Sequence, residues 1–481
     1  MLLRLIYDDK LAQASYLLGC QATGEAIVID ANRDADQYMS LARKEGVRIT
    51  HVTETHIHAD YLSGSRELAH RTRAKLLLSA NGGADWSYRF PEIESAQLLA
   101  DGARFRVGNI QIEVMHTPGH TPEHICFLVT DTASADKPIG LFSGDFVFVG
   151  DVGRPDLLEK AAGVAGTMEM SARALYQSLQ RFRELPDYLQ VWPGHGAGSA
   201  CGKALGAVPQ TTVGYEKMFN PALAADSEQQ FVDFILAGQP EPPKYFATMK
   251  RLNRDGPPLL NALPHPVRLD ARELDGAMQA GAVVVDARAA VSFARGHVPG
   301  TINIPYNKSF TNWAGWLIPY DRDFALIVDD RTDANQVARD LALIGLDRLQ
   351  GYFGDDAVQA AGETEQMRSV HTAEMIALAE TDGAIMIDVR NANERRAGHI
   401  PGTIHIPLGE LAERANELPR DKPIAVHCQG GGRAAIGASV LQSLGFDDVR
   451  HVKGGYTEWA RRNQPVSPVD AAAVPSSRSP Q

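Results

Sequence analysis

A repeated pattern in the second half of the chain constrains the fold more than any other feature. Residues 285–288 and 296–305 recur, with matching residue types, as 387–390 and 398–407, at a constant offset of 102 residues. Each copy has an apolar run ending in Asp, a polar stretch compatible with a helix, a Gly-His-x-Pro-Gly turn and another apolar run. Alternating strands and helices are typical of a parallel sheet covered by helices. The repeat therefore predicts two similar α/β domains in tandem.

Proline-rich segments suggest where the remaining domain ends. A chain of 481 residues is too long for one hydrophobic core. Prolines at 239–243 and 256–266 interrupt the periodic pattern, and the C-terminal segment is rich in Pro, Ser and Ala. We therefore expect a first domain at 1–240, a linker at 241–267, repeat domains at 268–362 and 370–464, and a disordered tail at 465–481.

The composition narrows the range of partners. The net charge of -12 disfavours nucleic-acid or anionic-membrane surfaces, because both require an excess of Lys and Arg. The apolar N-terminus ends at Asp8, too early for a signal peptide, and no later run reaches the roughly 20 apolar residues of a membrane span. The four cysteines show no CxxC spacing. We expect a cytoplasmic protein acting on small molecules, while homo-oligomerisation stays open.

Histidines and aspartates gather after the expected strands of the first domain. His56, His58 and Asp60 lie within five positions, and His116 and Asp145 each follow a strand-like apolar run. Loops that follow neighbouring strands converge on one pocket. Imidazole together with carboxylate suits zinc or iron. The pattern therefore predicts a metal site in this domain.

This set of residues resembles the metal-binding motif of the metallo-β-lactamase superfamily. The HxHxDH motif, the later histidine, the later aspartate and the final histidine of that family correspond to His56, His58, Asp60, His116, Asp145 and His195. The resemblance covers about residues 1 to 235 and implies an αββα sandwich. Tyr61 stands where the last histidine of the motif should be. Since a phenol is a poor ligand at neutral pH, one metal ion is favoured over two.

A single site with two histidines and one carboxylate is the ligand set of non-haem iron oxygenases. We therefore predict one Fe(II) per chain. The predicted ligands are His56, His116 and Asp145. The groups expected to orient these ligands or the substrate are His58, Asp60 and His195.

The surrounding residues resemble those of persulfide dioxygenases. Residues 55–64 match the THxHADxxSG segment of that family, and 143–156 match its GD...GRxD run. The resemblance implies oxidation of the outer sulfur of a thiol persulfide to sulfite by O2. Arg154 then either meets the negative charge of the substrate or forms an ordinary surface ion pair. Cys201 is either a redox thiol near the pocket or an inert packed residue.

The last repeat contains a cysteine in a glycine loop. Cys428 follows an apolar run and precedes a helix-compatible segment that begins near Arg433. Backbone N–H groups of such a loop stabilise a thiolate or a bound persulfide. The loop residues expected to bind the anion are Gly430, Gly431, Gly432 and Arg433.

This loop resembles the Cys-x-x-Gly-x-Arg loop of rhodanese sulfurtransferases, and the likeness extends over about residues 370–463. It implies that Cys428 is the catalytic persulfide carrier. A phosphatase also uses a cysteine and an arginine, but its loop generally carries one more residue. In the middle repeat Asp330 stands at the cysteine position and the glycines are absent. We therefore expect the middle rhodanese-like domain to be inactive and to serve as a spacer or docking surface.

Together these features predict two coupled reactions. The iron domain would convert a thiol persulfide and O2 to thiol and sulfite, and Cys428 would transfer a sulfane sulfur to sulfite, giving thiosulfate. Two alternatives remain. The first is a zinc thioester hydrolase resembling glyoxalase II. The second is a non-catalytic carrier or sensor of sulfane sulfur. The carrier thiol, the direction of sulfur transfer and the role of Cys201 are open.

Overall fold

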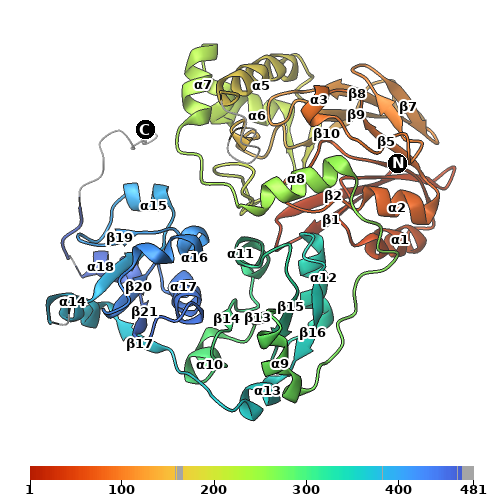
Figure 1. The fold of residues 1–481 in the computed structure, drawn as a ribbon. Helices are drawn as coiled ribbons and strands as arrows, with labels where there is room; N and C mark the ends of the chain where they lie inside the picture. Colours follow the sequence, from red (N-terminus) through yellow and green to blue (C-terminus); the bar gives the residue numbers. More distant parts are fainter. Residues whose placement is uncertain (158, 160–165, 382, 463, 468–481) are drawn as a thin grey trace. The chain divides into compact units, whose positions relative to one another are not determined.

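The computed structural model describes residues 1–157, 159, 166–381, 383–462 and 464–467. They form two compact units (Figure 1). The first comprises Met1–Pro264 and Arg339–Gly345, and the second comprises His265–Ala338 and Leu346–Gln481. Most of the expected tail at 465–481 falls outside the described residues. No helix in the described part of the chain is long and apolar enough to span a membrane.

The first unit contains two six-stranded sheets. The first sheet has the order β1-β2-β3-β4-β5-β6 and the second has the order β12-β11-β10-β9-β8-β7. The strands of the first sheet are β1 (Leu2–Asp8), β2 (Gln13–Cys20), β3 (Glu25–Ile29), β4 (Arg48–Thr53), β5 (Lys75–Ser79) and β6 (Gln97–Leu99). Those of the second are β7 (Arg104–Val107), β8 (Ile110–His116), β9 (Ile125–Asp131), β10 (Gly140–Gly144), β11 (Gln190–Pro193) and β12 (Thr211–Thr212).

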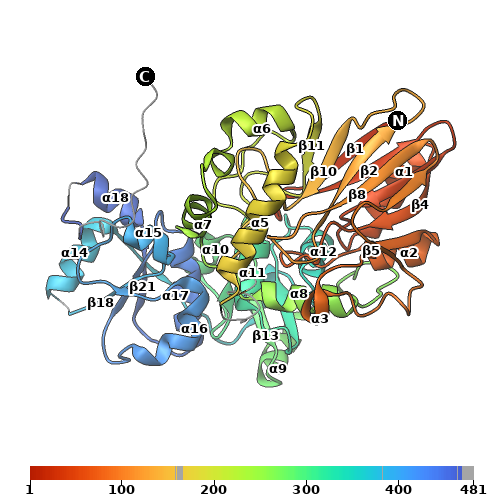
Figure 2. The same ribbon diagram turned by 90° about the horizontal axis from the view of Figure 1, so that it is seen from above.

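The helices of this unit are α1 (Ala35–Lys44), α2 (Ser65–Thr72), α3 (Gly83–Trp86), α5 (Met168–Arg183), α6 (Val213–Phe219), α7 (Glu228–Leu236) and α8 (Tyr245–Asp255). Figure 2 shows the two sheets between α1 and α2 on one side and α5 and α6 on the other. This arrangement confirms the predicted αββα sandwich.

Three hydrophobic clusters hold these layers together. The central cluster joins residues of both sheets, for example Leu18 of β2 with Phe127 of β9. One outer cluster includes Tyr38 of α1, and the other includes Leu175 of α5. A sheet with a helix layer on one face and another sheet on the other must be apolar on both faces. Consistent with this, every residue of β2 is buried.

The segment at 241–267 differs from the expected linker. It contains α8, and the first unit extends to Pro264. The prolines that suggested a linker flank this helix, because proline terminates a helix without preventing one from forming between two such sites.

The second unit contains two parallel sheets, with the orders β14-β13-β15-β16 and β17-β21-β20-β18-β19. Their strands are β13 (Val283–Asp286), β14 (Ile302–Asn303), β15 (Phe324–Ile327), β16 (Leu349–Phe353), β17 (Arg368–His371), β18 (Ile385–Asp388), β19 (Ile404–His405), β20 (Ile424–His427) and β21 (Val449–Lys453). The helices of residues 265–467 are α9 (Leu274–Gln279), α10 (Ala290–Arg295), α11 (Phe310–Leu317), α12 (Ala334–Leu343), α13 (Asp355–Ala360), α14 (Thr372–Thr381), α15 (Ala392–Arg396), α16 (Leu411–Arg414), α17 (Gly432–Ser443) and α18 (Gly455–Arg461).

The sequence repeat is also a repeat of strand register. Val285 pairs with Ile302 between β13 and β14, and Ile387 pairs with Ile404 between β18 and β19. Both residues of the second pair lie 102 positions after those of the first. The two repeats therefore form equivalent parallel βαβ units, as predicted.

Candidate functional sites

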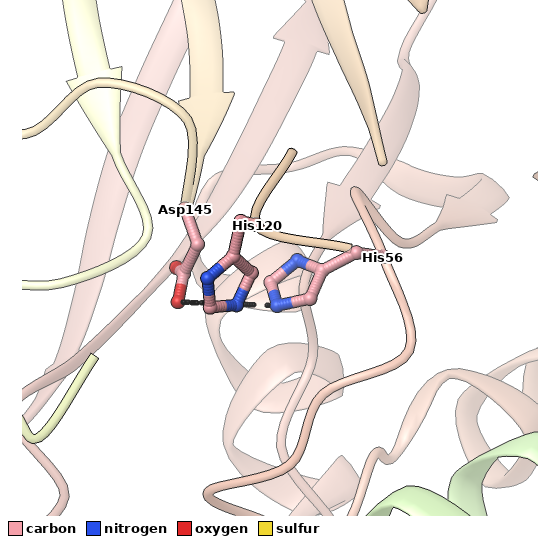
Figure 3. Close-up of side chains that lie close together, drawn as sticks. All are labelled: His56, His120 and Asp145. Carbon is pink, nitrogen blue, oxygen red and sulfur yellow. Dashed lines mark ion pairs between the residues drawn. The ribbon is translucent and has the colours of Figure 1, made fainter. Parts of the chain in front are cut away.

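Three loops of the first unit bring a carboxylate and two imidazoles together. His56 follows β4, Asp145 follows β10, and His120 lies in the loop between β8 and β9. The His120 Nε2 atom lies 3.5 Å from Asp145 Oδ2, and His56 Nε2 lies 3.9 Å from the same oxygen (Figure 3). One ligand atom from each residue lies within 4.8 Å of the other two. All three side chains are buried.

His116 is not part of this cluster, which corrects the sequence-based ligand set. It is the last residue of β8, where it still pairs with Ile125, and its Nε2 atom lies 2.8 Å from the carbonyl oxygen of Pro122. The loop therefore begins after His116, and His120 is its first histidine. Gly119 has φ of +149°, and a Cβ atom there would lie 2.4 Å from Cβ of Leu175. The Pro-Gly pair directly before His120 marked this tight turn in the sequence.

The hydrogen bonds of the cluster leave its inner nitrogen atoms free for a metal. Thr55 donates its hydroxyl to Asp30, so it accepts from Nδ1 of His56 at 2.9 Å. The Nδ1 atom of His120 donates to the carbonyl oxygen of Arg154 at 3.0 Å. Both rings therefore turn an unprotonated Nε2 toward Asp145.

The charge of Asp145 also requires a partner. Both of its carboxylate oxygens are buried, and neither accepts a hydrogen bond from the described residues. An unpaired buried carboxylate is unfavourable unless a cation neutralises it. Burial lowers the pKa of His56, as do the neighbouring imidazoles, and burial also lowers the pKa of His120. Two neutral imidazoles and one carboxylate are a donor set that fits Fe(II) or Zn(II).

Two further pairs surround the cluster. His58 contacts Asp30, with 3.1 Å between Nε2 and Oδ1. Burial lowers the pKa of His58, but Asp30 outweighs this effect and raises the pKa to about 9. His195 contacts Asp60, with 3.2 Å between Nε2 and Oδ2, and its Nδ1 atom donates to the carbonyl oxygen of Ala12. The ring centroids of His58 and His56 lie 4.2 Å apart, and His195 Nε2 lies 3.5 Å from Asp145 Oδ1, so both pairs lie beside the cluster.

Cys201 lies with this second pair. Its sulfur, one carboxylate oxygen of Asp60 and one ring nitrogen of His195 all lie within 4.8 Å of one another. Burial raises the pKa of the thiol well above its ordinary value, and Asp60 and Asp145 act in the same direction. The structure therefore places Cys201 next to the metal cluster.

Tyr61 forms a hydrogen bond with the backbone of Asp30. Its ring is fully buried, and its hydroxyl donates to the carbonyl oxygen of Asp30 at 3.2 Å. Burial raises the pKa of this phenol well above its ordinary value, as do the carboxylates of Asp30 and Asp60. The side chain is thus a protonated hydrogen-bond donor with no tendency to ligate a metal.

Of the two roles left open for Arg154, the structure shows an ion pair, which is buried and does not lie at the surface as expected. Its side chain is fully buried, and its guanidinium donates to both carboxylate oxygens of Asp156 at 2.8 and 2.7 Å. It also donates to the carbonyl oxygen of Ala200 at 3.1 Å, and its backbone N–H donates to that of Cys201. Arg154 therefore holds the loop that carries Cys201.

His124 is a residue of the centre that sequence reasoning missed. Its Nε2 atom accepts the backbone N–H of Asp145 at 3.1 Å, and its Nδ1 atom contacts the hydroxyl of Thr117 at 2.8 Å. Since Nε2 accepts, the proton must be on Nδ1. His124 thereby fixes the backbone of Asp145. Its position directly before β9, four residues after His120, was the only signal in the sequence.

The Cys428 loop of the second unit holds a backbone donor at the cysteine sulfur. It connects β20 to α17, and the backbone N–H of Gly431 donates to Sγ of Cys428 at 3.0 Å. Gly431 has φ of +107°, a conformation that favours glycine. Arg433 donates to both carboxylate oxygens of Glu394, at 2.6 Å each. Glu394 was not identified from the sequence, because it lies 39 residues from Arg433.

The corresponding loop of the middle repeat holds no nucleophile. After β15 the chain continues through Asp329 and Asp330. Asp329 Oδ1 accepts hydrogen bonds from the backbone N–H of Arg331 and the hydroxyl of Thr332. In this acidic turn the N–H of Arg331 and the hydroxyl of Thr332 are used by Asp329.

Comparisons with known proteins agree with this architecture. A family model described as "Metallo-beta-lactamase superfamily" matches residues 8–195, and one described as "Rhodanese-like domain" matches 270–354 and 371–462. A solved structure titled as a metallo-beta-lactamase from Staphylococcus aureus subsp. aureus COL is 44% identical. The match covers 73% of this chain and 99% of that one, with a TM-score of 0.68. The chain belongs to the metallo-β-lactamase superfamily. It combines this domain with two rhodanese-like domains.

Curated relatives of this superfamily member differ in their activities. A "Hydroxyacylglutathione hydrolase" from Rhodopseudomonas palustris is 32% identical over 50% of this chain and 80% of the relative. The "Persulfide dioxygenase ETHE1, mitochondrial" from Bos taurus is 27% identical over 48% of this chain and 78% of the relative. For two other curated relatives the chain spans only 53% and 60% of their length. The superfamily and an enzymatic ancestry are thus shown, while the reaction is a separate question.

Proposed function

We propose that the first unit is a mononuclear iron persulfide dioxygenase. We further propose that the second unit contains a sulfurtransferase whose catalytic residue is Cys428. The observation that carries this proposal is the buried cluster of His56, His120 and Asp145, which has two neutral imidazoles and one carboxylate whose oxygens accept no hydrogen bond from the described residues. Such a set leaves coordination positions open for a substrate and O2. The likeness to a persulfide dioxygenase supports the same reaction.

Tyr61 supports one metal rather than two. The second metal of a two-metal site would need a ligand at this position, but the buried phenol donates to Asp30. When bound, Fe(II) would supply a Lewis-acidic centre for the soft persulfide sulfur and for O2. The reaction balances when one thiol persulfide, one O2 and one water give one thiol, one sulfite and two protons.

The other residues of the first unit orient the reacting groups. His124 fixes the backbone of Asp145, and the carbonyl oxygen of Arg154 fixes the ring of His120. His58 forms a buried pair with Asp30. It would supply a protonated imidazole beside the anionic substrate. These contacts require no rearrangement before substrate binds.

The second unit would use the sulfite. Cys428 takes the outer sulfur of a second thiol persulfide, which leaves as the thiol, and the N–H of Gly431 stabilises the sulfur of Cys428. Sulfite attacks the outer sulfur, the S–S bond to Cys428 breaks, and the cysteine leaves as a thiolate. The products are thiosulfate and free Cys428, with no additional oxidant.

One other reaction has a specific observation in its favour. The 32% identity to a hydroxyacylglutathione hydrolase is consistent with a zinc thioester hydrolase. In that reaction zinc-bound hydroxide would attack a thioester carbonyl. Tyr61 and the dioxygenase-like sequence around it favour the oxygenase.

The experiment compares both reactions on the same protein. The full chain is purified without oxygen, its metal content is measured, and oxygen uptake is followed on glutathione persulfide and coenzyme A persulfide. Hydrolysis of a glutathione thioester is assayed in parallel. We expect one iron per chain, oxygen uptake with one persulfide and sulfite as the first product. Thioester hydrolysis by a zinc-loaded protein that consumes no oxygen would overturn the proposal.

A further inference from the structure

Helix α8 packs its buried face against the rest of the first unit. This helix lies beyond residue 195, where the superfamily match ends. Its buried residues are Tyr245, Phe246, Met249, Lys250 and Asn253. Positions separated by three and four residues form one face of a helix. Two of these buried residues are polar, which is unusual for a packed helix face and indicates specific partners.

The side-chain amide of Asn253 forms hydrogen bonds with the loop at 56–63, which carries the candidate metal ligand His56. Its Nδ2 atom donates to the carbonyl oxygens of His58 at 2.7 Å and Tyr61 at 2.8 Å, and its Oδ1 atom accepts the N–H of Ser63 at 2.9 Å. The side chain is only 1% exposed. Both donors and the acceptor of the amide are therefore used on the segment that follows His56.

The loop at 56–63 depends on such contacts. It is buried along most of its length and contains neither helix nor strand. Buried backbone groups outside regular structure need partners from elsewhere, because leaving them unpaired is unfavourable. Asn253 supplies three of these partners at once. Its contacts begin two residues after His56 and end three residues after Asp60.

A second contact holds the same loop from another side. Glu123, fully buried, accepts the backbone N–H of Ile57 at 2.7 Å. Burial raises the pKa of Glu123 to about 7, and Lys250 of α8 acts weakly in the opposite direction; the Lys250 ammonium lies 3.6 Å from the ring centroid of Trp86. Helix α8 thus contacts the loop through Asn253, while Glu123 holds the backbone at Ile57.

We propose that Asn253 is a positioning residue of the metal centre, which holds the loop at 56–63 in the conformation that presents His56 to the metal. This inference rests on the proposed metal binding by His56, His120 and Asp145. It makes α8 part of the metal site, although no residue of α8 belongs to the metal cluster.

Two substitutions separate the contributions of the amide. Asn253→Asp keeps the size and the acceptor for Ser63, but replaces the donor group by an oxygen that faces two carbonyl oxygens. Asn253→Ala removes all three hydrogen bonds. Loss of a group that orients a metal ligand typically weakens metal binding about 10–100-fold. We expect both variants to lie in this range. Arg251→Ala, at an exposed position of the same helix, is the matched control.

The test measures metal affinity of the metal-free full chain, with Fe(II) and Zn(II) titrated separately against a chelator. Thermal unfolding of the metal-free proteins is measured in parallel. A purely structural role would lower the unfolding temperature but leave the affinity of the folded protein unchanged. Wild-type affinity in both Asn253 variants would overturn the proposal. The titrations involve no persulfide, so failure of the proposed reaction would be seen separately.

A measurement on the unaltered protein covers the case in which the variants do not fold. Hydrogen exchange of the Ser63 backbone amide is followed in the metal-free chain. We expect strong protection, because this N–H is buried against Asn253. Exchange as fast as in an exposed loop would show that the hydrogen bond from Ser63 to Asn253 does not form without metal, and it would refute the inference.

Discussion

Two histidines four positions apart offer a sharp test of the metal centre. Replacing His120 by alanine removes one of three nitrogen and oxygen donors from the cluster. Replacing His116 by alanine removes a half-exposed ring whose contact is the carbonyl oxygen of Pro122. The two variants make the same chemical change within one segment, so they differ mainly in the position of the lost imidazole.

The expected effects differ by orders of magnitude. Structural zinc sites with four ligands contribute about 10–16 kcal/mol of binding free energy, which is about 2.5–4 kcal/mol for each ligand. Loss of His120 should therefore weaken metal binding about 10²–10³-fold. Loss of His116 should leave metal affinity unchanged. It should lower the free energy of unfolding by no more than one hydrogen bond contributes, which is about 0.5–1.5 kcal/mol.

The assay combines iron content after anaerobic reconstitution with competition against a chelator and thermal unfolding. His120→Ala should retain little iron and lose oxygen uptake, while sulfur transfer by Cys428 continues. His116→Ala should resemble the wild type in iron content and oxygen uptake. If His116→Ala lost its iron and His120→Ala kept it, the ligand assignment would be wrong and the original sequence-based set would be restored.

Three further predictions concern the second unit. Cys428→Ser should keep the initial rate of oxygen uptake but accumulate sulfite instead of thiosulfate, measured by separating both anions after trapping; an unchanged thiosulfate yield above a no-enzyme control would exclude Cys428 as the carrier. An isolated fragment of 268–362 should transfer no sulfur to cyanide, because Asp330 replaces the cysteine, and any transfer above background would contradict this. Burial raises the pKa of Glu394, but Arg433 outweighs this effect and lowers it below the ordinary value of 4.5. The stability from this pair should thus be present above about pH 4.5 and decrease as the pH falls through the lower folded value. Glu394→Gln should flatten the pH dependence of thermal unfolding there, and equal slopes in both proteins would refute the assignment.

The sequence by itself determined the features that depend on neighbouring residues. The 102-residue repeat predicted two equivalent βαβ units, and the strand registers at Val285 and Ile387 agree with it. The strand-like apolar run before His116 is strand β8, in which Ile110, Ile112 and Val114 are buried and alternate with less buried polar residues. The glycine loop after Cys428 was also recognisable, since its turn and its N–H donor lie within three residues.

Only the tertiary structure decided which side chains meet. The strand containing His116 extends one residue too far for that histidine to enter the cluster, so His120 takes its place. The sequence left two roles open for Arg154, and the packing of the chain buries it in an ion pair with Asp156. Asn253 lies 195 residues from His58, within a proline-rich stretch that suggested a linker. Local patterns specify strands, turns and loops, because neighbouring backbone groups determine them. Contacts between distant segments depend on how whole layers pack, and no periodicity of the sequence records that.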